Sequence, residues 1–141
     1  MSAPPAPPAP RRRVLIVDDC PDAADALAAL LGLFGHECET ATEGRAALAK
    51  ARATRFDLAI VDIELPDLSG HELARELRRL PGGAAMHLVA ISGHGHPDDR
   101  RRSLAAGFDQ HLTKPIDGAM ARRLVEDAGA GPTSARASAR R

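Results

Sequence analysis

Hydrophobic residues along this chain alternate between short runs and stretches in which they recur at helical spacing. The runs predict strands near 13–17, 37–41, 57–61, 87–91 and 109–112. Between and after them, apolar residues three and four positions apart predict helices near 21–34, 43–53, 70–80, 97–106 and 117–128. Five strand–helix alternations predict an α/β protein with a doubly wound, five-stranded parallel sheet.

Residues suited to helix ends support these boundaries. Gly35 follows the first helix and is expected to cap it. Pro97 and the two acidic residues after it suit the first turn of the fourth helix, which Gly107 ends. The strand near 37–41 alternates polar and small residues, so we expect it at an edge of the sheet.

Polar residues end or follow four of the five predicted strands. Asp18 and Asp19 follow the first, Asp62 the third, Ser92 the fourth and Lys114 the fifth. Ligands of an open parallel sheet bind outside the carboxyl ends of its strands. We therefore expect three carboxylates, one hydroxyl and one ammonium to meet at one edge of the sheet.

Three neighbouring carboxylates predict a bound cation. Each like-charge pair at about 4 Å costs roughly 4 kcal/mol at an effective dielectric constant of about 20. Mg²⁺ prefers oxygen ligands and often shares one or two carboxylates with a phosphate. Asp19 and Asp62 are the expected direct ligands, with Asp18 acting through a water molecule and Glu64 through its backbone carbonyl.

The same residues suit phosphoryl chemistry. The Asp62 carboxylate can act as a nucleophile, the Lys114 ammonium can neutralise phosphoryl oxygens, and the Ser92 hydroxyl can hydrogen-bond one of them. Taken singly, each residue has a structural explanation as a helix cap or a turn former. Their conjunction at four strand ends favours chemistry over structure alone.

Length and composition narrow the possible functions. The 141 residues suffice for one domain, and 44% of them are hydrophobic. A formal net charge of +0, with three Phe and no Tyr or Trp, argues against a nucleic-acid surface. The sequence has no apolar stretch near the length of a membrane helix and no signal-peptide pattern, so a cytoplasmic protein is expected. Cys20 and Cys38 form no C-x-x-C motif and are expected to be small buried side chains.

Both ends of the chain read as disordered tails. Residues 1–11 are mostly Pro and Ala, and residues 129–141 are mostly Gly, Ala, Ser and Arg. A single domain over 12–128 is therefore expected. Few residues remain after the fifth helix, so we expect the output to be a protein contact or onward phosphotransfer.

Four segments make the chain resemble the receiver domain of response regulators in two-component signalling. They are VLIVDDCPDAADAL at 14–27, DLAIVDIELPDLSGHEL at 57–73, LVAISGHG at 88–95 and AGFDQHLTKPID at 106–117. The resemblance implies the flavodoxin-like fold of this family, with Mg²⁺ as the required ion. It also implies that Asp62 takes a phosphoryl group from a histidine kinase or a histidine phosphotransfer protein, and that a target protein, which the sequence does not name, then binds.

The resemblance assigns further roles by matching motifs. Asp18 and Asp19 correspond to the acidic pair of the family, Ser92 to the switch hydroxyl and Lys114 to the phosphate-sensing lysine. The peptide bond before Pro115 is cis in this family. Glu64 and His94 stand where the family's residues influence the lifetime of the phosphoryl group.

His111 departs from the family pattern. An aromatic residue normally occupies this switch position and rotates to follow the hydroxyl inward. An imidazole is smaller and titrates near neutral pH, so its coupling is expected to be weaker or pH-sensitive. Replacing His111 by Tyr is then expected to change partner affinity more than phosphorylation rate.

Three alternatives remain open at this stage. The acid cluster also suits a Mg²⁺-dependent phosphohydrolase with Asp62 as nucleophile, and Glu64 is its candidate water-activating acid. A binding module that works without phosphorylation is a second alternative. In the third, His94 and His96 bind zinc with His111 as a third ligand, although nothing fixes a fourth.

Overall fold

The computed structural model describes residues 11–93 and 97–129. The strands are β1 (Arg13–Val17), β2 (Glu37–Ala41), β3 (Leu58–Asp62), β4 (His87–Ser92) and β5 (Gln110–Thr113). The helices are α1 (Pro21–Leu33), α2 (Gly44–Ala53), α3 (Gly70–Arg79), α4 (Pro97–Ala106) and α5 (Gly118–Gly129). All ten elements alternate as predicted, and every end coincides with the predicted one or differs from it by one residue. Most of the predicted tail residues lie outside the described part of the chain.

The five strands form one parallel sheet in the order β2-β1-β3-β4-β5, which confirms the doubly wound α/β fold. β1, β3 and β4 lie inside the sheet, which explains their continuous apolar runs. β2 pairs only with β1 and is an edge strand, as its alternating polar residues predict.

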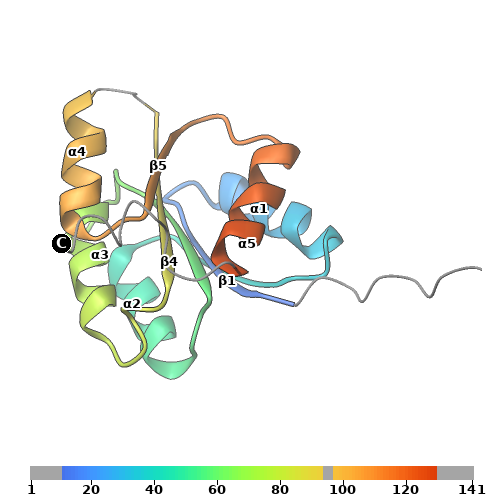
Figure 1. Ribbon diagram of the computed structural model, residues 1–141, viewed down its shortest axis with the longest axis horizontal. Helices are drawn as coiled ribbons and strands as arrows, with labels where there is room; N and C mark the ends of the chain where they lie inside the picture. Colours follow the sequence, from blue (N-terminus) through green and yellow to red (C-terminus); the bar gives the residue numbers. More distant parts are fainter. Residues whose placement is uncertain (1–10, 94–96, 130–141) are drawn as a thin grey trace, which may run out of the picture.

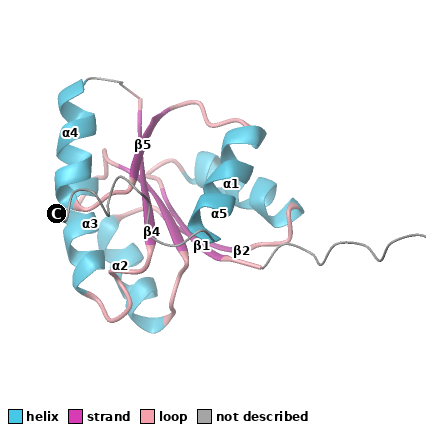
Figure 2. Cartoon of the chain, viewed as in Figure 1, coloured by secondary structure: helices cyan, strands magenta, loops and turns pink. Residues whose placement is uncertain are grey.

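Helices cover both faces of the sheet (Figures 1 and 2). On one face α1 and α5 pack over Val14 and Ile16 of β1. On the other face α2 and α3 pack over Leu15 and Val17 of the same strand, and α4 joins them through Ala106. Successive side chains of a strand point to opposite faces, so one apolar run supplies both cores.

A buried ion pair ties α3 to the start of β4 and β5. The Arg78 guanidinium lies 2.9 Å from the Asp109 carboxylate, which is 0% exposed and also accepts a hydrogen bond from the Leu88 amide. Arg78 donates further hydrogen bonds to the carbonyl groups of Gly107 and Met86. This network lies at the opposite end of the strands from the predicted site.

Glycines with positive φ end two helices. Gly35 has φ +92° directly after the last turn of α1, and Gly107 has φ +117° directly after α4. Both conformations favour glycine because other residues meet a Cβ clash there. The helix-ending roles predicted for these two residues are confirmed.

Candidate functional site

The carboxyl ends of four neighbouring strands bring the predicted residues to one edge of the sheet. Asp18 and Asp19 follow β1, while Asp62 and Ser92 are the last residues of β3 and β4. Lys114 follows β5, and its amide donates a hydrogen bond to the Ser92 carbonyl. The parallel pairing of β1, β3, β4 and β5 therefore sets the arrangement of the site.

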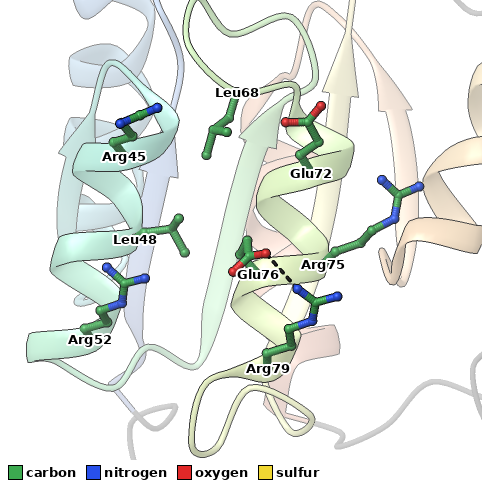
Figure 3. A pocket seen from close by; sticks show the side chains of 8 residues that line it. All are labelled: Arg45, Leu48, Arg52, Leu68, Glu72, Arg75, Glu76 and Arg79. Carbon is green, nitrogen blue, oxygen red and sulfur yellow. Dashed lines mark hydrogen bonds and ion pairs between the residues drawn. The ribbon is translucent and has the colours of Figure 1, made fainter.

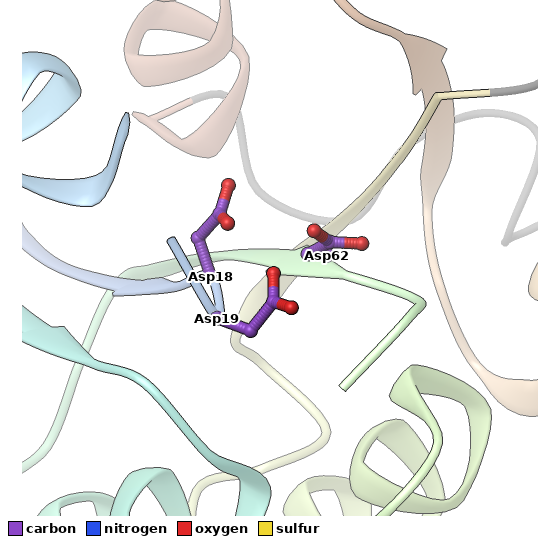
Figure 4. Close-up of side chains that lie close together, drawn as sticks. All are labelled: Asp18, Asp19 and Asp62. Carbon is purple, nitrogen blue, oxygen red and sulfur yellow. The ribbon is translucent and has the colours of Figure 1, made fainter. Parts of the chain in front are cut away.

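Three carboxylates meet at this edge (Figure 4). One oxygen each from Asp18, Asp19 and Asp62 lies within 4.8 Å of the others. Asp18 and Asp62 are buried, whereas Asp19 is exposed. The amide of Cys20 donates to Asp18 Oδ1 and that of Glu64 to Asp62 Oδ1, each over 2.9 Å. The two buried side chains are thus oriented by the turns that follow them.

One ammonium is shared between the two buried carboxylates. Lys114 Nζ lies 3.1 Å from Asp18 Oδ2 and 3.1 Å from Asp62 Oδ2. Burial lowers the pKa of Lys114, but hydrogen bonds to Asp62 and Asp18 outweigh it and raise the pKa above its ordinary value. The lysine therefore stays charged, and both carboxylates stabilise its charge.

That ammonium compensates the negative charge of Asp62 only in part. Burial raises the pKa of Asp62, and hydrogen bonds from Glu64 and Lys114 oppose the rise without cancelling it. The negative charge of Asp18 adds to the rise. The site therefore lacks positive charge, and its hard oxygen donors suit a divalent cation such as Mg²⁺.

The peptide bond Lys114–Pro115 is cis, as the resemblance implies. A groove of about 330 Å³ begins at this loop and runs along α1. Asp18 and Lys114 line it, and Leu27, Leu30 and Ile116 supply apolar walls. This groove opens directly beside the carboxylates.

A larger cleft of about 500 Å³ lies elsewhere, between α2 and α3 (Figure 3). Four arginines and two glutamates surround Leu48 and Leu68 there. None of the strand-end residues lines it, so its size does not make it the site of the predicted chemistry.

The hydroxyl at the end of β4 belongs to a buried hydrogen-bond chain. Ser92 Oγ lies 2.9 Å from Nε2 of His111, and His111 Nδ1 lies 2.7 Å from Ser103 Oγ. Ser103 Oγ in turn lies 3.0 Å from Nε2 of His71. We call these four residues the histidine–serine chain.

Burial is the main cause of the lowered pKa values of His111 and His71, the two rings of the histidine–serine chain. The Arg100 guanidinium further lowers the pKa of His111, and Arg102 and Arg75 further lower that of His71. Both imidazoles are therefore neutral near neutral pH. Sequence reasoning missed His71 and Ser103, whose only signal is a polar side chain on a helix face that packs against the sheet.

Other predicted residues take different places. Glu64 is exposed, and its carboxylate does not belong to the acid cluster found among the described residues. His94 and His96 lie outside the described part of the chain, and His111 already contacts two serines. The prediction of buried cysteines is wrong for Cys20, which is exposed because it stands at the N-cap of α1.

No helix within residues 11–93 and 97–129 combines the length and the apolar character needed to cross a bilayer.

Comparisons with known proteins agree with this geometry. A family model described as the response regulator receiver domain matches residues 14–126. The gliding motility regulatory protein of Myxococcus xanthus is 40% identical over 109 residues, which cover 77% of this chain. The chain spans only 14% of the length of that relative.

Two solved structures extend the comparison. A CheY-like receiver domain from Methanospirillum hungatei is 31% identical, with a TM-score of 0.78, covering 86% of this chain and 96% of that one. The receiver domain of a sensor histidine kinase from Pseudomonas aeruginosa is 27% identical, with a TM-score of 0.77, covering 85% and 99%. That structure has a magnesium ion coordinated in its active-site cleft.

Proposed function

Since the chain belongs to the response regulator receiver domain family, we propose that Asp62 is its phosphoacceptor. The main support is the ammonium that Asp62 shares with Asp18, at 3.1 Å from each, beside the third carboxylate of Asp19. Three carboxylates and one ammonium leave two negative charges. A divalent cation balances that charge.

Mg²⁺ is the cation that we propose for this site. Asp19 and Asp62 are the direct carboxylate ligands, and the Glu64 carbonyl adds a third oxygen. Asp18, whose two oxygens contact the Cys20 amide and the Lys114 ammonium, acts through a water molecule in this proposal. When bound, Mg²⁺ neutralises charge on the phosphoryl oxygens.

Phosphoryl transfer needs no general base at Asp62. A carboxylate oxygen forms the new bond to phosphorus as the bond between phosphorus and the donor's histidine nitrogen breaks, and the electron pair stays on that nitrogen. Lys114 binds one phosphoryl oxygen through its ammonium. Ser92 binds another through its hydroxyl and, with His111, forms the switch that a target protein reads.

The groove along α1 is the proposed docking place of the phosphoryl donor. A histidine kinase or histidine phosphotransfer protein must bring its phosphohistidine to the carboxylates. The apolar groove ends at Asp18 and Lys114, so a donor helix packed on Leu27 and Leu30 can present a histidine to Asp62.

A phosphohydrolase is less well supported. That reaction requires a further acid to activate water, and Glu64 was the candidate. Its side chain is exposed, and among the described residues only Asp18, Asp19 and Asp62 form the acid cluster. We therefore propose a signalling switch rather than an enzyme with its own substrate.

Acetyl phosphate tests the assignment of Asp62. In the presence of Mg²⁺ we expect the intact mass to rise by one phosphoryl group in the parent protein and not in Asp62→Asn. Asp57→Asn is the matched control, because Asp57 directly precedes the other end of β3, where its carboxylate accepts a hydrogen bond from the Arg13 amide.

Loss of the adduct in both variants, or in neither, would contradict the assignment. The Cys20 and Glu64 amides, which donate to the two buried carboxylates, give a second readout by NMR. Their resonances should shift with Mg²⁺ and again with beryllofluoride, a phosphoryl analogue.

A further inference from the structure

The histidine–serine chain runs from the phosphoryl site into two helices. Its members are Ser92 on β4, His111 on β5, Ser103 on α4 and His71 on α3, and none is more than 7% exposed. The three contacts between them measure 2.9, 2.7 and 3.0 Å. Four elements are thus linked by one continuous set of polar contacts.

The hydrogen bonds of such a chain can all be donated in one direction along it or all in the other. A hydroxyl carries one proton and a neutral imidazole carries one N–H, so His111 and Ser103 in the middle each donate to one neighbour and accept from the other. If Ser92 donates to His111 Nε2, the proton of His111 is on Nδ1 and points to α4. If Ser92 donates elsewhere, Nε2–H of His111 can donate to the Ser92 oxygen instead.

Groups on α4 favour the first direction in the absence of a phosphoryl group. Burial and Arg100 lower the pKa of His111, while Asp99 opposes them through its charge and a backbone hydrogen bond. A backbone group that favours the protonated ring is a carbonyl, which can only accept. Nδ1 is the ring nitrogen that faces α4, because it contacts Ser103, one turn after Asp99 on that helix. A proton on Nδ1 therefore lies on the α4 side of the ring.

A phosphoryl group redirects the Ser92 O–H away from His111. Its oxygens can only accept, so the Ser92 hydroxyl must turn toward it. Nε2 of His111 then needs a proton to keep its contact with Ser92, and Nδ1 accepts from Ser103. Ser103 in turn accepts from Nε2–H of His71. Each ring releases the proton on Nδ1 to water and takes one from water on Nε2, so every member holds the same number of protons in both arrangements.

We propose that Ser103 and His71 are positioning residues of the phosphoryl site, and that phosphorylation reverses the polarity of the histidine–serine chain. This inference rests on the proposed function of Asp62. The reversal carries the event at Asp62 to α3 and α4 as a change of tautomer at two histidines. His111 does this with its ring in place, because both of its nitrogens are already engaged.

Tautomers are read directly from ¹⁵N-histidine-labelled protein by long-range ¹H–¹⁵N spectra. On addition of Mg²⁺ and beryllofluoride, Nδ1 of His111 should move from the protonated to the unprotonated ¹⁵N position and Nε2 the opposite way. His71 should gain its proton on Nε2. His36 and His87 do not belong to the chain and serve as internal controls.

The ¹⁹F spectrum of the bound fluoride separates the two proposals. Absence of the adduct would overturn the proposed function and this inference with it. An adduct with unchanged tautomers at both rings would overturn the inference alone, since a chain that only fills space has no reason to reverse.

Ser103 variants test the middle of the chain. Ser103→Ala should still form the adduct but leave the His71 tautomer unresponsive, and Ser103→Thr should restore the response because it keeps the hydroxyl. A full His71 response in Ser103→Ala would show that the signal does not pass through this hydroxyl and would overturn the proposal.

Discussion

Removing the Lys114 ammonium should have opposite effects on Mg²⁺ binding and on phosphoryl transfer. In the absence of metal, Lys114 occupies one oxygen each of Asp18 and Asp62. Mg²⁺ must approach the same carboxylates against that positive charge. Lys114→Met is therefore expected to bind Mg²⁺ more tightly and to accept a phosphoryl group more slowly.

The expected size of each effect follows from the geometry. Two unit charges about 4 Å apart interact by roughly 1 kcal/mol in water and roughly 4 kcal/mol at an effective dielectric constant of about 20. The Lys114 side chain is 36% exposed, so the lower limit applies. A divalent ion doubles it to about 2 kcal/mol, which is roughly 30-fold in affinity. Losing one donor to the phosphoryl oxygens should slow transfer by about 10²–10³-fold.

The chain supplies a matched control in its only other lysine. Lys50→Met removes the same charge from α2, where the ammonium donates to the Thr40 carbonyl and not to the strand-end carboxylates. Because the chain has no Tyr or Trp, Mg²⁺ binding is best followed by the amide resonances of Cys20 and Glu64. Transfer from acetyl phosphate is followed by intact mass.

Either half of the prediction can fail by itself. Equal Mg²⁺ affinity in Lys114→Met and Lys50→Met would show that the ammonium does not compete with the ion. An unchanged transfer rate in Lys114→Met would remove this lysine from the transfer step.

Three further predictions concern stability measured by urea unfolding. Gly70→Ala should destabilise the protein by about 1–3 kcal/mol, because the new Cβ would lie 2.5 Å from Ile63 Cα. In Gly32→Ala the new Cβ meets nothing within 4 Å, so this variant should stabilise α1 by about 0.5–1 kcal/mol. Equal effects of the two substitutions would refute the steric argument. Arg78→Met should lower the free energy of unfolding by about 3–5 kcal/mol, and adding Asp109→Asn should recover part of this loss by removing a buried charge whose arginine partner is gone. No recovery would contradict this. Both rings of the histidine–serine chain have pKa values below the ordinary 6.5, so below that pH the unfolded state binds more protons than the folded state. Stability should therefore fall as the pH falls, by up to about 1.4 kcal/mol per pH unit for each ring. A flat stability profile between about pH 7.5 and about pH 5.5 would exclude this prediction.

The sequence was informative about the fold because the two periodicities are well separated. Strands buried on both faces give continuous apolar runs, and the helices between them show a spacing of three and four residues. The ends of strands are less well defined. Asp62 and Ser92 are the last paired residues of β3 and β4 rather than the first after them, because polar residues keep their backbone pairing.

The site residues were predictable for a topological reason. Once the strands are known to be parallel, the residues at their carboxyl ends must share one edge of the sheet. The meeting of Asp18, Asp19, Asp62 and Lys114 follows from that rule without knowledge of any distance. The place of the Glu64 side chain does not follow, because residues after the strand are free to point outward.

The histidine–serine chain illustrates what sequence patterns leave out. Ser103 contacts His111 eight residues away and His71 thirty-two residues away. The three residues lie on different elements, so no period within one helix or strand relates them, and the contacts depend on how α3 and α4 pack against β5. The sequence predicts that coupling through His111 is weaker or pH-sensitive, and this stays a prediction. The structure adds that hydrogen bonds to two serines hold the ring.

The end of β3 and the loop after it show how two carboxylates close together in the sequence come to differ. Asp67 accepts hydrogen bonds from the Arg45 and Gly44 amides, which lower its pKa, so that its charge is stabilised by the fold and joins the loop to α2. Asp62, five residues earlier, has a raised pKa because burial outweighs its hydrogen bonds. A carboxylate whose charge the fold already satisfies has a structural role. Asp62, whose charge is left partly unsatisfied beside two more carboxylates, is the one that we propose binds a cation and reacts.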